Sequence, residues 1–227
     1  MNILGLDTST EACTAALGMD DVITERFELG GRHAERLLVM VDELLAEANI
    51  TLAQIDAIAF GRGPGSFTGV RIATGVAQGL AFGANRPVIP VSSLAAIAQG
   101  VNAEKILAAM DARMEQVYWG AFKRGPDGVV EPVDEERVTD PGKIPVPNDM
   151  GWTGAGSGWG AYHALLSARL GNCLEGWREN AYPRGRSIVE LGVAGLAHGV
   201  AVSPENALPV YLRNDVAAKA ASTAKVR

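Results

Sequence analysis

Residues 55–91, IDAIAFGRGPGSFTGVRIATGVAQGLAFGANRPVIPV, contain the pattern that decides the fold. The apolar run over 55–60 predicts a buried strand, and GRGPGS predicts a loop because glycine and proline interrupt regular structure. A helix is predicted over 67–84 and a second strand over 87–91. Strand, helix and strand in this order are typical of a parallel crossover, so the stretch predicts an α/β fold.

The segments before this stretch extend it into an N-terminal lobe. Apolar runs over 3–6, 13–17 and 22–29 predict three short strands that are joined by polar turns. Two glycines then interrupt the pattern, and a helix is predicted over 33–49. We therefore expect a mixed sheet that is flanked by helices.

The composition changes near residue 101, where a second lobe is expected to begin. Its first predicted elements are a strand over 106–110 and a hairpin with its turn at 125–128. An irregular acidic and proline-rich connection is predicted over 131–147, and a glycine- and tryptophan-rich turn over 149–160 after a weak strand. Two helices are predicted at the end, over 161–170 and 187–200. We predict a duplicated α/β architecture with lobes 1–100 and 101–227. The end of the chain is expected to become mobile, and the sequence leaves open whether the C-terminal segment packs back on the first lobe.

The charge balance argues against a protein that holds nucleic acid by itself. Lys and Arg total 20 against 26 Asp and Glu, which gives a net charge of −6. Phosphate neutralisation usually needs a basic surface. Any role in RNA chemistry is therefore expected to depend on a partner that binds the RNA.

A cytoplasmic location is expected from three features of the sequence. Cys13 and Cys173 are the only cysteines and lie far apart, so a disulfide framework is not expected. The apolar runs are shorter than the roughly 18 residues that a membrane span needs, and we expect none. The first residues lack the basic segment of a secretory signal.

Two loops are candidates for contact with a phosphate. LGLDTST, at 4–10, ends a strand with an acid and a tight polar turn, which can position a metal and offer N–H groups to an anion. GRGPGS, at 61–66, opens a helix whose free N–H groups attract anions, although it matches neither the Walker loop nor the dinucleotide fingerprint. The alternative is that both are ordinary turns that satisfy their own backbone groups. The candidate contact residues are Asp7, Thr8, Ser9, Gly63, Gly65 and Ser66.

Several blocks of sequence together resemble the TsaB (YeaZ) family. They are LGLDTST at 4–10, GGRHAERLL at 30–38, GRGPGSFTGVRIATGVAQGLAFG at 61–83, MDARMEQVYWGAF at 110–122 and the ending VYLR at 210–213. The matches are spread over most of the chain, and GPGSFTGVR is the most specific of them. The resemblance implies the acetate and sugar kinase–Hsp70–actin (ASKHA) fold, an α/β fold of two lobes with mixed sheets flanked by helices.

The resemblance also implies a function. The chain would be a non-catalytic partner subunit that scaffolds or activates TsaD, the related enzyme that attaches a threonylcarbamoyl group to a tRNA adenosine. A TsaE-like ATPase is a further partner that the family suggests, and tRNA would be contacted only indirectly. No cofactor is expected for the chain itself, although ATP or ADP bound together with the partner stays open.

The metal site of TsaD is not expected in this chain. In TsaD, two histidines three residues apart on a helix bind the metal, whereas the corresponding stretch here, 92–98, is SSLAAIA. The three histidines, His33, His163 and His198, are too far apart in sequence for one helix to direct two imidazoles at one ion. We therefore predict no metal site and no catalytic residue.

Two helices carry more apolar surface than one lobe needs. The apolar side chains of the helix over 33–49 span roughly 160°, wider than the ~100° stripe of a surface helix, and Val39 and Ala46 form a second apolar spot. On the helix over 67–84, Arg71 is the only charged residue. We predict that these helices form a bundle with a partner, or with a second copy in a homodimer; the alternative is that one lobe covers them. The predicted contact residues are His33, Leu37, Met40, Val41, Leu44, Val70, Ala73, Thr74, Ala77 and Leu80.

The competing function is a nucleotide-binding enzyme of the same fold, either a small-molecule kinase or a metal-dependent hydrolase. A kinase needs acids positioned for Mg²⁺ and ATP, and Asp7 and Asp111 are the candidates near strand ends. Asp111 could instead form an ion pair with Arg113. His33 could act as a general base, but no nucleophile stands at a recognisable spacing, so we interpret it as a polar residue at a helix entrance.

Overall fold

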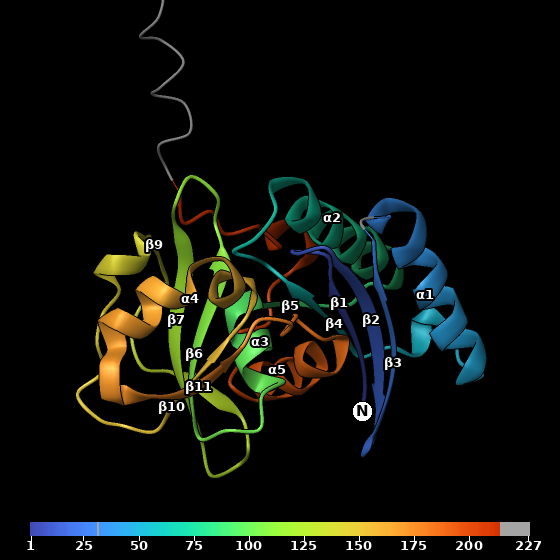
Figure 1. Cartoon of the computed structure of the whole chain (residues 1–227). Helices are drawn as coiled ribbons and strands as arrows, with labels where there is room; N and C mark the ends of the chain where they lie inside the picture. Colours follow the sequence, from blue (N-terminus) through green and yellow to red (C-terminus); the bar gives the residue numbers. More distant parts are fainter. Residues whose placement is uncertain (31, 214–227) are drawn as a thin grey trace, which may run out of the picture.

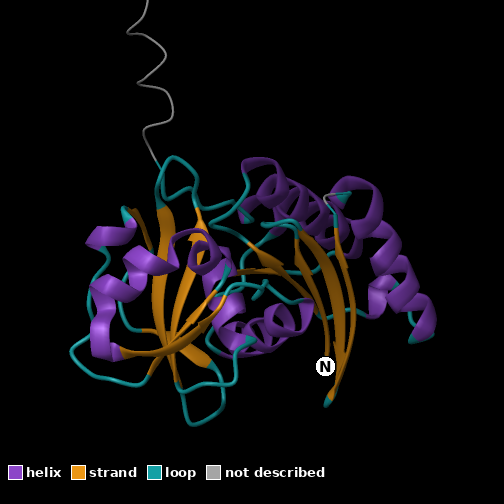
Figure 2. Ribbon diagram, in the orientation of Figure 1, coloured by secondary structure: helices purple, strands orange, loops and turns teal. Residues whose placement is uncertain are grey.

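The structure is a computed structural model that describes residues 1–30 and 32–213. Two sheets form the two halves of the molecule, and helices lie between them and on their outer sides (Figures 1 and 2). None of the helices in the described residues combines the length and the apolar character that a membrane span requires.

The first sheet has five strands in the order β3-β2-β1-β4-β5. Its strands are β1 (Asn2–Asp7), β2 (Ala12–Met19), β3 (Val22–Leu29), β4 (Ala57–Gly61) and β5 (Val88–Val91). The first three form an antiparallel meander, whereas β4 and β5 run parallel to β1. Helix α2 (Phe67–Ala84) joins β4 to β5, which confirms the predicted parallel crossover.

The second sheet repeats this topology. Its strands are β6 (Lys105–Asp111), β7 (Val117–Arg124), β8 (Val130–Pro132), β9 (Arg137–Thr139), β10 (Trp152–Ala155) and β11 (Leu174–Arg178). The order is β11-β10-β6-β7-β8, and β9 also pairs with β7. β7 is antiparallel to β6, while β10 and β11 continue the sheet in parallel on the other side of β6. Helix α4 (Ser157–Leu170) joins β10 to β11 as α2 joins β4 to β5, so the predicted duplication is confirmed.

The described part of the chain also contains four short 3₁₀ helices. They are η1 (Leu52–Gln54), η2 (Pro141–Lys143), η3 (Gly171–Cys173) and η4 (Pro204–Asn206). Each follows or precedes a longer element, where a tighter turn ends the regular structure.

The last helix of each half packs on the sheet of the other half. α3 (Ser93–Gln99) follows β5 of the first sheet but packs against β6 and β7 of the second. α5 (Gly185–Ala197) follows β11 of the second sheet but packs against β1 and β2 of the first. The two helices also contact each other between the sheets (Figure 1). The two halves are therefore interlocked by an exchange of helices.

Glycines allow α5 to lie close to the first sheet. A Cβ atom at Gly18 would lie 2.5 Å from Val189 Cγ1, and one at Gly5 would lie 2.8 Å from Val189 Cγ2. A Cβ atom at Gly192, on the helix itself, would lie 2.6 Å from the Cβ atom of Ala59. A larger side chain at any of these glycines would displace the helix, because packed interiors have little spare volume.

Residues 207–213, which we call the strap, connect the two halves a second time. The Val210 N–H donates to the Arg62 carbonyl oxygen at 2.8 Å in the first half. At the other end, Arg213 Nη2 donates to Gln116 Oε1 at 2.6 Å in the second half. The predicted mobile end of the chain lies outside the described residues.

Four parts of the second half differ from the sequence prediction, and the first is that β10 lies within the predicted turn over 149–160. The connection over 131–147 contains β9 and the end of β8, and β11 lies where no strand was predicted. Both strands are short, β9 is partly exposed and β11 is mostly exposed, so they lack the apolar pattern that marks a buried strand. Helix α4 begins at Ser157 and not at residue 161, because two glycines in its first turn weaken the helical signal.

Helices α1 (His33–Glu47) and α2 bury most of the residues that were predicted to contact a partner. The buried set comprises Leu37, Met40, Val41, Leu44, Val70, Ala73, Thr74 and Ala77, whereas His33 and Leu80 are partly exposed. The apolar arc of each helix faces the first sheet, and Leu37, Met40 and Ala77 join its core cluster. In the lone chain these buried side chains are core residues and only the outer faces of the two helices are accessible, so contact of the predicted residues with a partner stays a prediction.

Val41→Glu is expected to destabilise the lone chain strongly, because Val41 is 1% exposed and a buried, unpaired carboxylate costs several kcal/mol. Val39→Glu is the matched control on the same helix, since Val39 is 40% exposed, and should change the free energy of unfolding by less than about 0.5 kcal/mol. Urea denaturation of both variants measures the difference. Equal losses would contradict the orientation of α1.

Candidate functional site

The two predicted phosphate loops meet at one edge of the first sheet. LGLDTST follows β1 and GRGPGS follows β4, and parallel strands end at the same edge. The Ser66 N–H donates to the Ser9 carbonyl oxygen at 2.7 Å, which ties the loops together. The Ser93 N–H donates to the Gly63 carbonyl oxygen at 3.0 Å, so the loop after β5 joins them. The structure therefore brings together all six candidate contact residues.

Asp7 is the centre of this arrangement and is fully buried. Its Oδ1 accepts hydrogen bonds from the Ser9 N–H and from Ser9 Oγ, both at 2.8 Å. Its Oδ2 accepts a hydrogen bond from Ser93 Oγ at 3.0 Å. Burial raises the pKa of Asp7, while the hydrogen bonds from Ser9 and Ser93 and the nearby His33 oppose that shift. We call Asp7, Ser9 and Ser93 the polar cluster.

The glycines of the second loop leave no free volume beside these residues. A Cβ atom at Gly61 would lie 1.7 Å from Asp7 Oδ2, and one at Gly69 would lie 1.9 Å from the Thr8 carbonyl oxygen. Thr8 Oγ1 also donates to the Gly69 carbonyl oxygen at 2.7 Å. The glycines are thus required for close approach of backbone to backbone, which supports the alternative of turns that satisfy their own polar groups. Phosphate contact stays a prediction, and Ser66 is the most exposed of its candidate residues.

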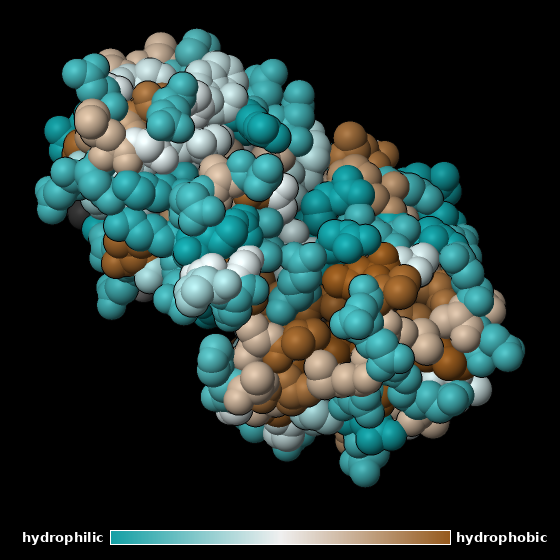
Figure 3. All heavy atoms as spheres, turned by 90° about the horizontal axis from the view of Figure 1, so that it is seen from below, coloured by the Kyte–Doolittle hydropathy of each residue, from teal (hydrophilic) through white to brown (hydrophobic). Residues whose placement is uncertain are grey.

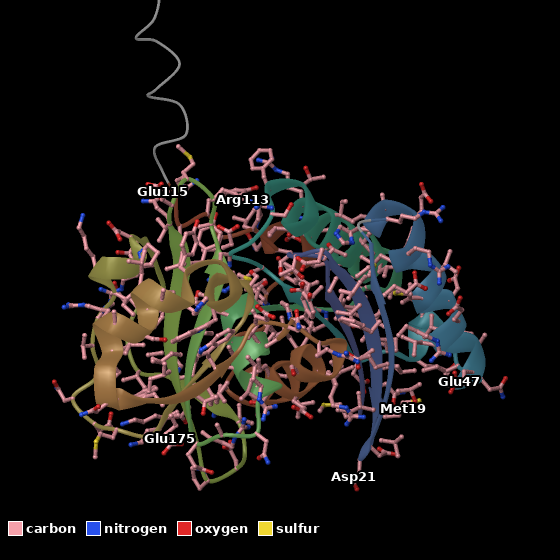
Figure 4. All side chains as sticks on the ribbon, in the orientation of Figure 1. Met19, Asp21, Glu47, Arg113, Glu115 and Glu175 are labelled. Atoms are coloured by element: carbon pink, nitrogen blue, oxygen red, sulfur yellow. The ribbon has the colours of Figure 1, made fainter. Side chains whose placement is uncertain are left out.

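Asp111, the other candidate acid, takes part in the turn between β6 and β7. Its Oδ1 accepts the Arg113 N–H at 2.8 Å, and its Oδ2 lies 3.1 Å from Arg113 Nη1. Tyr162 donates from its hydroxyl to Asp111 Oδ1 at 3.4 Å. Figure 4 shows Arg113 and Glu115 at the top of the molecule, on this turn. The ion pair that was the alternative interpretation of Asp111 is therefore present.

The three histidines lie in separate places. His33 begins α1, and its Nδ1 is buried and has no hydrogen-bond partner among the residues that the structure describes. His163 stacks on Trp177, with ring centroids 5.1 Å apart, and His198 ends α5. Among residues 1–30 and 32–213, no three His, Cys, Asp or Glu side chains form a group that could hold a metal ion.

The surface of α1 and α2 that points away from the first sheet carries several exposed apolar side chains beside charged ones such as Glu43 and Arg71. Phe82 is 81% exposed, and Phe67, Leu38 and Val39 are also exposed. Seen from below, hydrophobic residues gather over the half of the molecule that holds the first sheet (Figure 3). We call the exposed apolar residues of α1 and α2 the outer face. Leu38 and Phe82 were not among the predicted contact residues, although Leu38 is next in sequence to Val39, where the sequence indicated a second apolar spot.

Three glycines follow one line along the outer face of α2. Gly75, Gly79 and Gly83 are spaced by four residues, which places them on one side of the helix. A Cβ atom built at any of them meets nothing within 4 Å, so the space above them is open. Each glycine costs a helix about 1 kcal/mol relative to alanine, and close approach of another backbone is a physical reason to tolerate that cost.

Comparison with known proteins assigns the chain to a family. A family model described as TsaD, tRNA N6-adenosine threonylcarbamoyltransferase, matches residues 28–221. The tRNA threonylcarbamoyladenosine biosynthesis protein TsaB of Escherichia coli K12 is 41% identical, over 96% of this chain and 97% of its own length. The chain belongs to the TsaB family.

Further relatives of the TsaB family agree in sequence and in structure. The tRNA threonylcarbamoyladenosine biosynthesis protein TsaB of Haemophilus influenzae is 40% identical over 95% of each chain. The solved structure of YeaZ from Pseudomonas aeruginosa has a TM-score of 0.85 and 44% identity, and the match covers 93% of this chain and 99% of that one. These likenesses confirm the predicted family and the two-lobed ASKHA fold.

Asp7→Ala is expected to lower the free energy of unfolding by about 2–4 kcal/mol, because three buried donors on Ser9 and Ser93 lose their acceptor. Asp7→Asn keeps an acceptor oxygen and is the conservative control, with a smaller loss expected. Chemical denaturation of both variants measures the effect. Equal losses would show that the hydrogen bonds of the polar cluster contribute little.

The stability of the Asp7→Asn variant relative to the wild type is also expected to depend on pH. Because the folded-state pKa of Asp7 is raised, its contribution to stability is full below its ordinary pKa and declines as the pH rises through the folded-state value. Asp7→Asn lacks this decline, so its stability relative to the wild type should improve as the pH rises from about 4 to about 7. A relative stability that falls over this range would mean that the folded state favours the carboxylate.

Proposed function

We propose that this chain is a non-catalytic partner subunit of a TsaD-like threonylcarbamoyltransferase in the formation of threonylcarbamoyladenosine in tRNA. The observation that carries the proposal is the outer face of α1 and α2, which a lone TsaB-family chain leaves exposed. For the partner contact we propose the exposed residues Leu38, Val39 and Phe82, because most positions predicted from the sequence are buried in the lone chain. The chain would work in the cytoplasm and contact tRNA only through its partner.

Two features support a role in association. Phe82 and Leu38 expose apolar area that association would remove from water, at about 25 cal/mol per Å². The line of Gly75, Gly79 and Gly83 would let a partner helix approach closely, as small residues do in tight helix pairs. A symmetric homodimer through the same face is proposed for the chain alone.

The polar cluster supports the non-catalytic part of the proposal. In enzymes with parallel strands, the crevice beyond the strand ends usually receives the ligand. In this chain, Asp7 uses both carboxylate oxygens for hydrogen bonds to Ser9 and Ser93. An acid that is buried and already bonded is poorly placed to hold Mg²⁺, which prefers to keep several water ligands.

A TsaE-like ATPase as a further partner, and ATP or ADP bound with the partner, remain parts of the same proposal.

Titration calorimetry of the lone chain with ATP separates this proposal from the nucleotide-binding enzyme. Tight binding by the lone chain would favour the enzyme. Transfer of threonylcarbamoyl to tRNA by the lone chain would overturn the partner role.

Gly79→Arg is expected to reduce co-purification with a TsaD homologue at least tenfold, or about 1.4 kcal/mol, because the side chain occupies the space a partner helix needs. The lone variant should stay folded, since nothing lies within 4 Å of the new Cβ atom. Ala164→Arg, at an exposed position of α4 in the other half, is the matched control and should co-purify normally. Normal co-purification of folded Gly79→Arg would contradict the use of this face.

A further inference from the structure

A cleft of about 650 Å³ lies between the two sheets and is lined by residues of both halves. β5 and α5 contribute residues from one side, β7 and β8 from the other, and the strap completes the lining. Small-molecule sites usually have volumes of roughly 300–1,000 Å³, so the cleft is large enough for a ligand. Its main apolar residues are Ile89, Val91, Phe122, Val130, Leu191 and Leu212.

Glu136 gives the cleft a carboxylate. It is half-buried, and it accepts a hydrogen bond from Ser92 Oγ. Burial raises the pKa of Glu136, while Ser92 and the nearby Arg62 oppose that shift. A carboxylate has about four positions that can accept hydrogen bonds, so one hydroxyl leaves capacity for the ammonium group of a ligand.

Arg62 contributes a cation to the same cleft, and hydrogen bonds hold its backbone in place. Its N–H donates to the Val91 carbonyl oxygen at 2.8 Å, and its own carbonyl oxygen accepts the Val210 N–H at 2.8 Å. The residue is therefore held between β5 and the strap. A guanidinium binds a carboxylate with two parallel hydrogen bonds, which suits it to orient a ligand.

We propose that the cleft binds a small zwitterion with an apolar body, in the class of free apolar amino acids and dipeptides. The ligand's carboxylate lies on Arg62, its ammonium group lies on Glu136, and its apolar body packs between Phe122 and Leu191. Of the residues that line the cleft, none belongs to α1 or α2, so this inference does not depend on the proposed function.

The other charged residues of the lining leave this choice of ligand in place. Asp134 forms an ion pair with Arg137, and Glu135 is exposed to water. A purely anionic ligand would pair with Arg62 but would be repelled by the carboxylate of Glu136. A purely cationic ligand would leave Arg62 unpaired, and a desolvated charge without a partner is costly. A zwitterion pairs both charges at once.

The experiment is a titration of the purified full chain, followed by amide chemical shifts in NMR. The probe is L-phenylalanine, and its two matched analogues are phenethylamine, which lacks the carboxylate, and 3-phenylpropionate, which lacks the ammonium group. L-phenylalanine is expected to shift amides of the cleft, such as those of Ala95, Gly195 and Val210. Each analogue should bind at least about tenfold more weakly, because it leaves one protein charge unpaired.

Three variants test the residue assignments. Glu136→Gln and Arg62→Gln should each weaken the binding of L-phenylalanine at least about tenfold, whereas Glu131→Gln, an exposed acid near the cleft, should not. Ala95→Leu fills part of the cleft and should abolish binding while thermal denaturation shows a folded protein. The proposal is overturned by no binding up to about 10 mM, by shifts confined to residues outside the cleft, or by equal affinity for both analogues and L-phenylalanine.

Discussion

The exchange of α3 and α5 between the two halves is the constraint on which the rest of the structure depends. Each sheet needs a helical layer on its inner side, and the helix that supplies it comes from the sequence of the other half. Val189 can lie against β1 and β2 only because Gly5 and Gly18 have no side chain. The distance and angle between the sheets are therefore set by this packing, and so is the cleft between them.

The exchange also fixes the loops at the edge of the first sheet. Ser93 begins α3, so the packing of that helix on the second sheet places its hydroxyl against Asp7. The polar cluster closes the strand ends where related folds usually open toward a ligand. The surface that the chain leaves open is instead on α1 and α2, on the opposite side of the first sheet from α5. Strand ends that are closed by the polar cluster, together with exposed apolar residues on α1 and α2, are features expected of a protein that acts by binding a partner.

The sequence predicted the elements with strong apolar periodicity and missed those without it. The strands β1 to β5 and helices α1 and α2 follow from local patterns, whereas β9 and β11 are short edge strands with no such pattern. The helical periodicity of α1 located its apolar faces but did not show which face packs on the sheet. Val41 was therefore predicted to contact a partner, whereas it is buried in the core of the lone chain. The loops around Asp7 were recognisable, but the contribution of Ser93 depends on tertiary packing. The cleft combines residues from six separate segments of the chain, which no local pattern could reveal.

The origin of α5 has a consequence for the order in which the protein is made. Its residues, Gly185–Ala197, lie near the end of a chain of 227 residues, yet they cover a sheet whose first strand begins at Asn2. During synthesis on the ribosome, one apolar surface of the first sheet therefore stays uncovered until α5 has been synthesised. Such an intermediate exposes an apolar surface of the kind that chaperones bind, and it makes the covering of the first sheet a late step in folding.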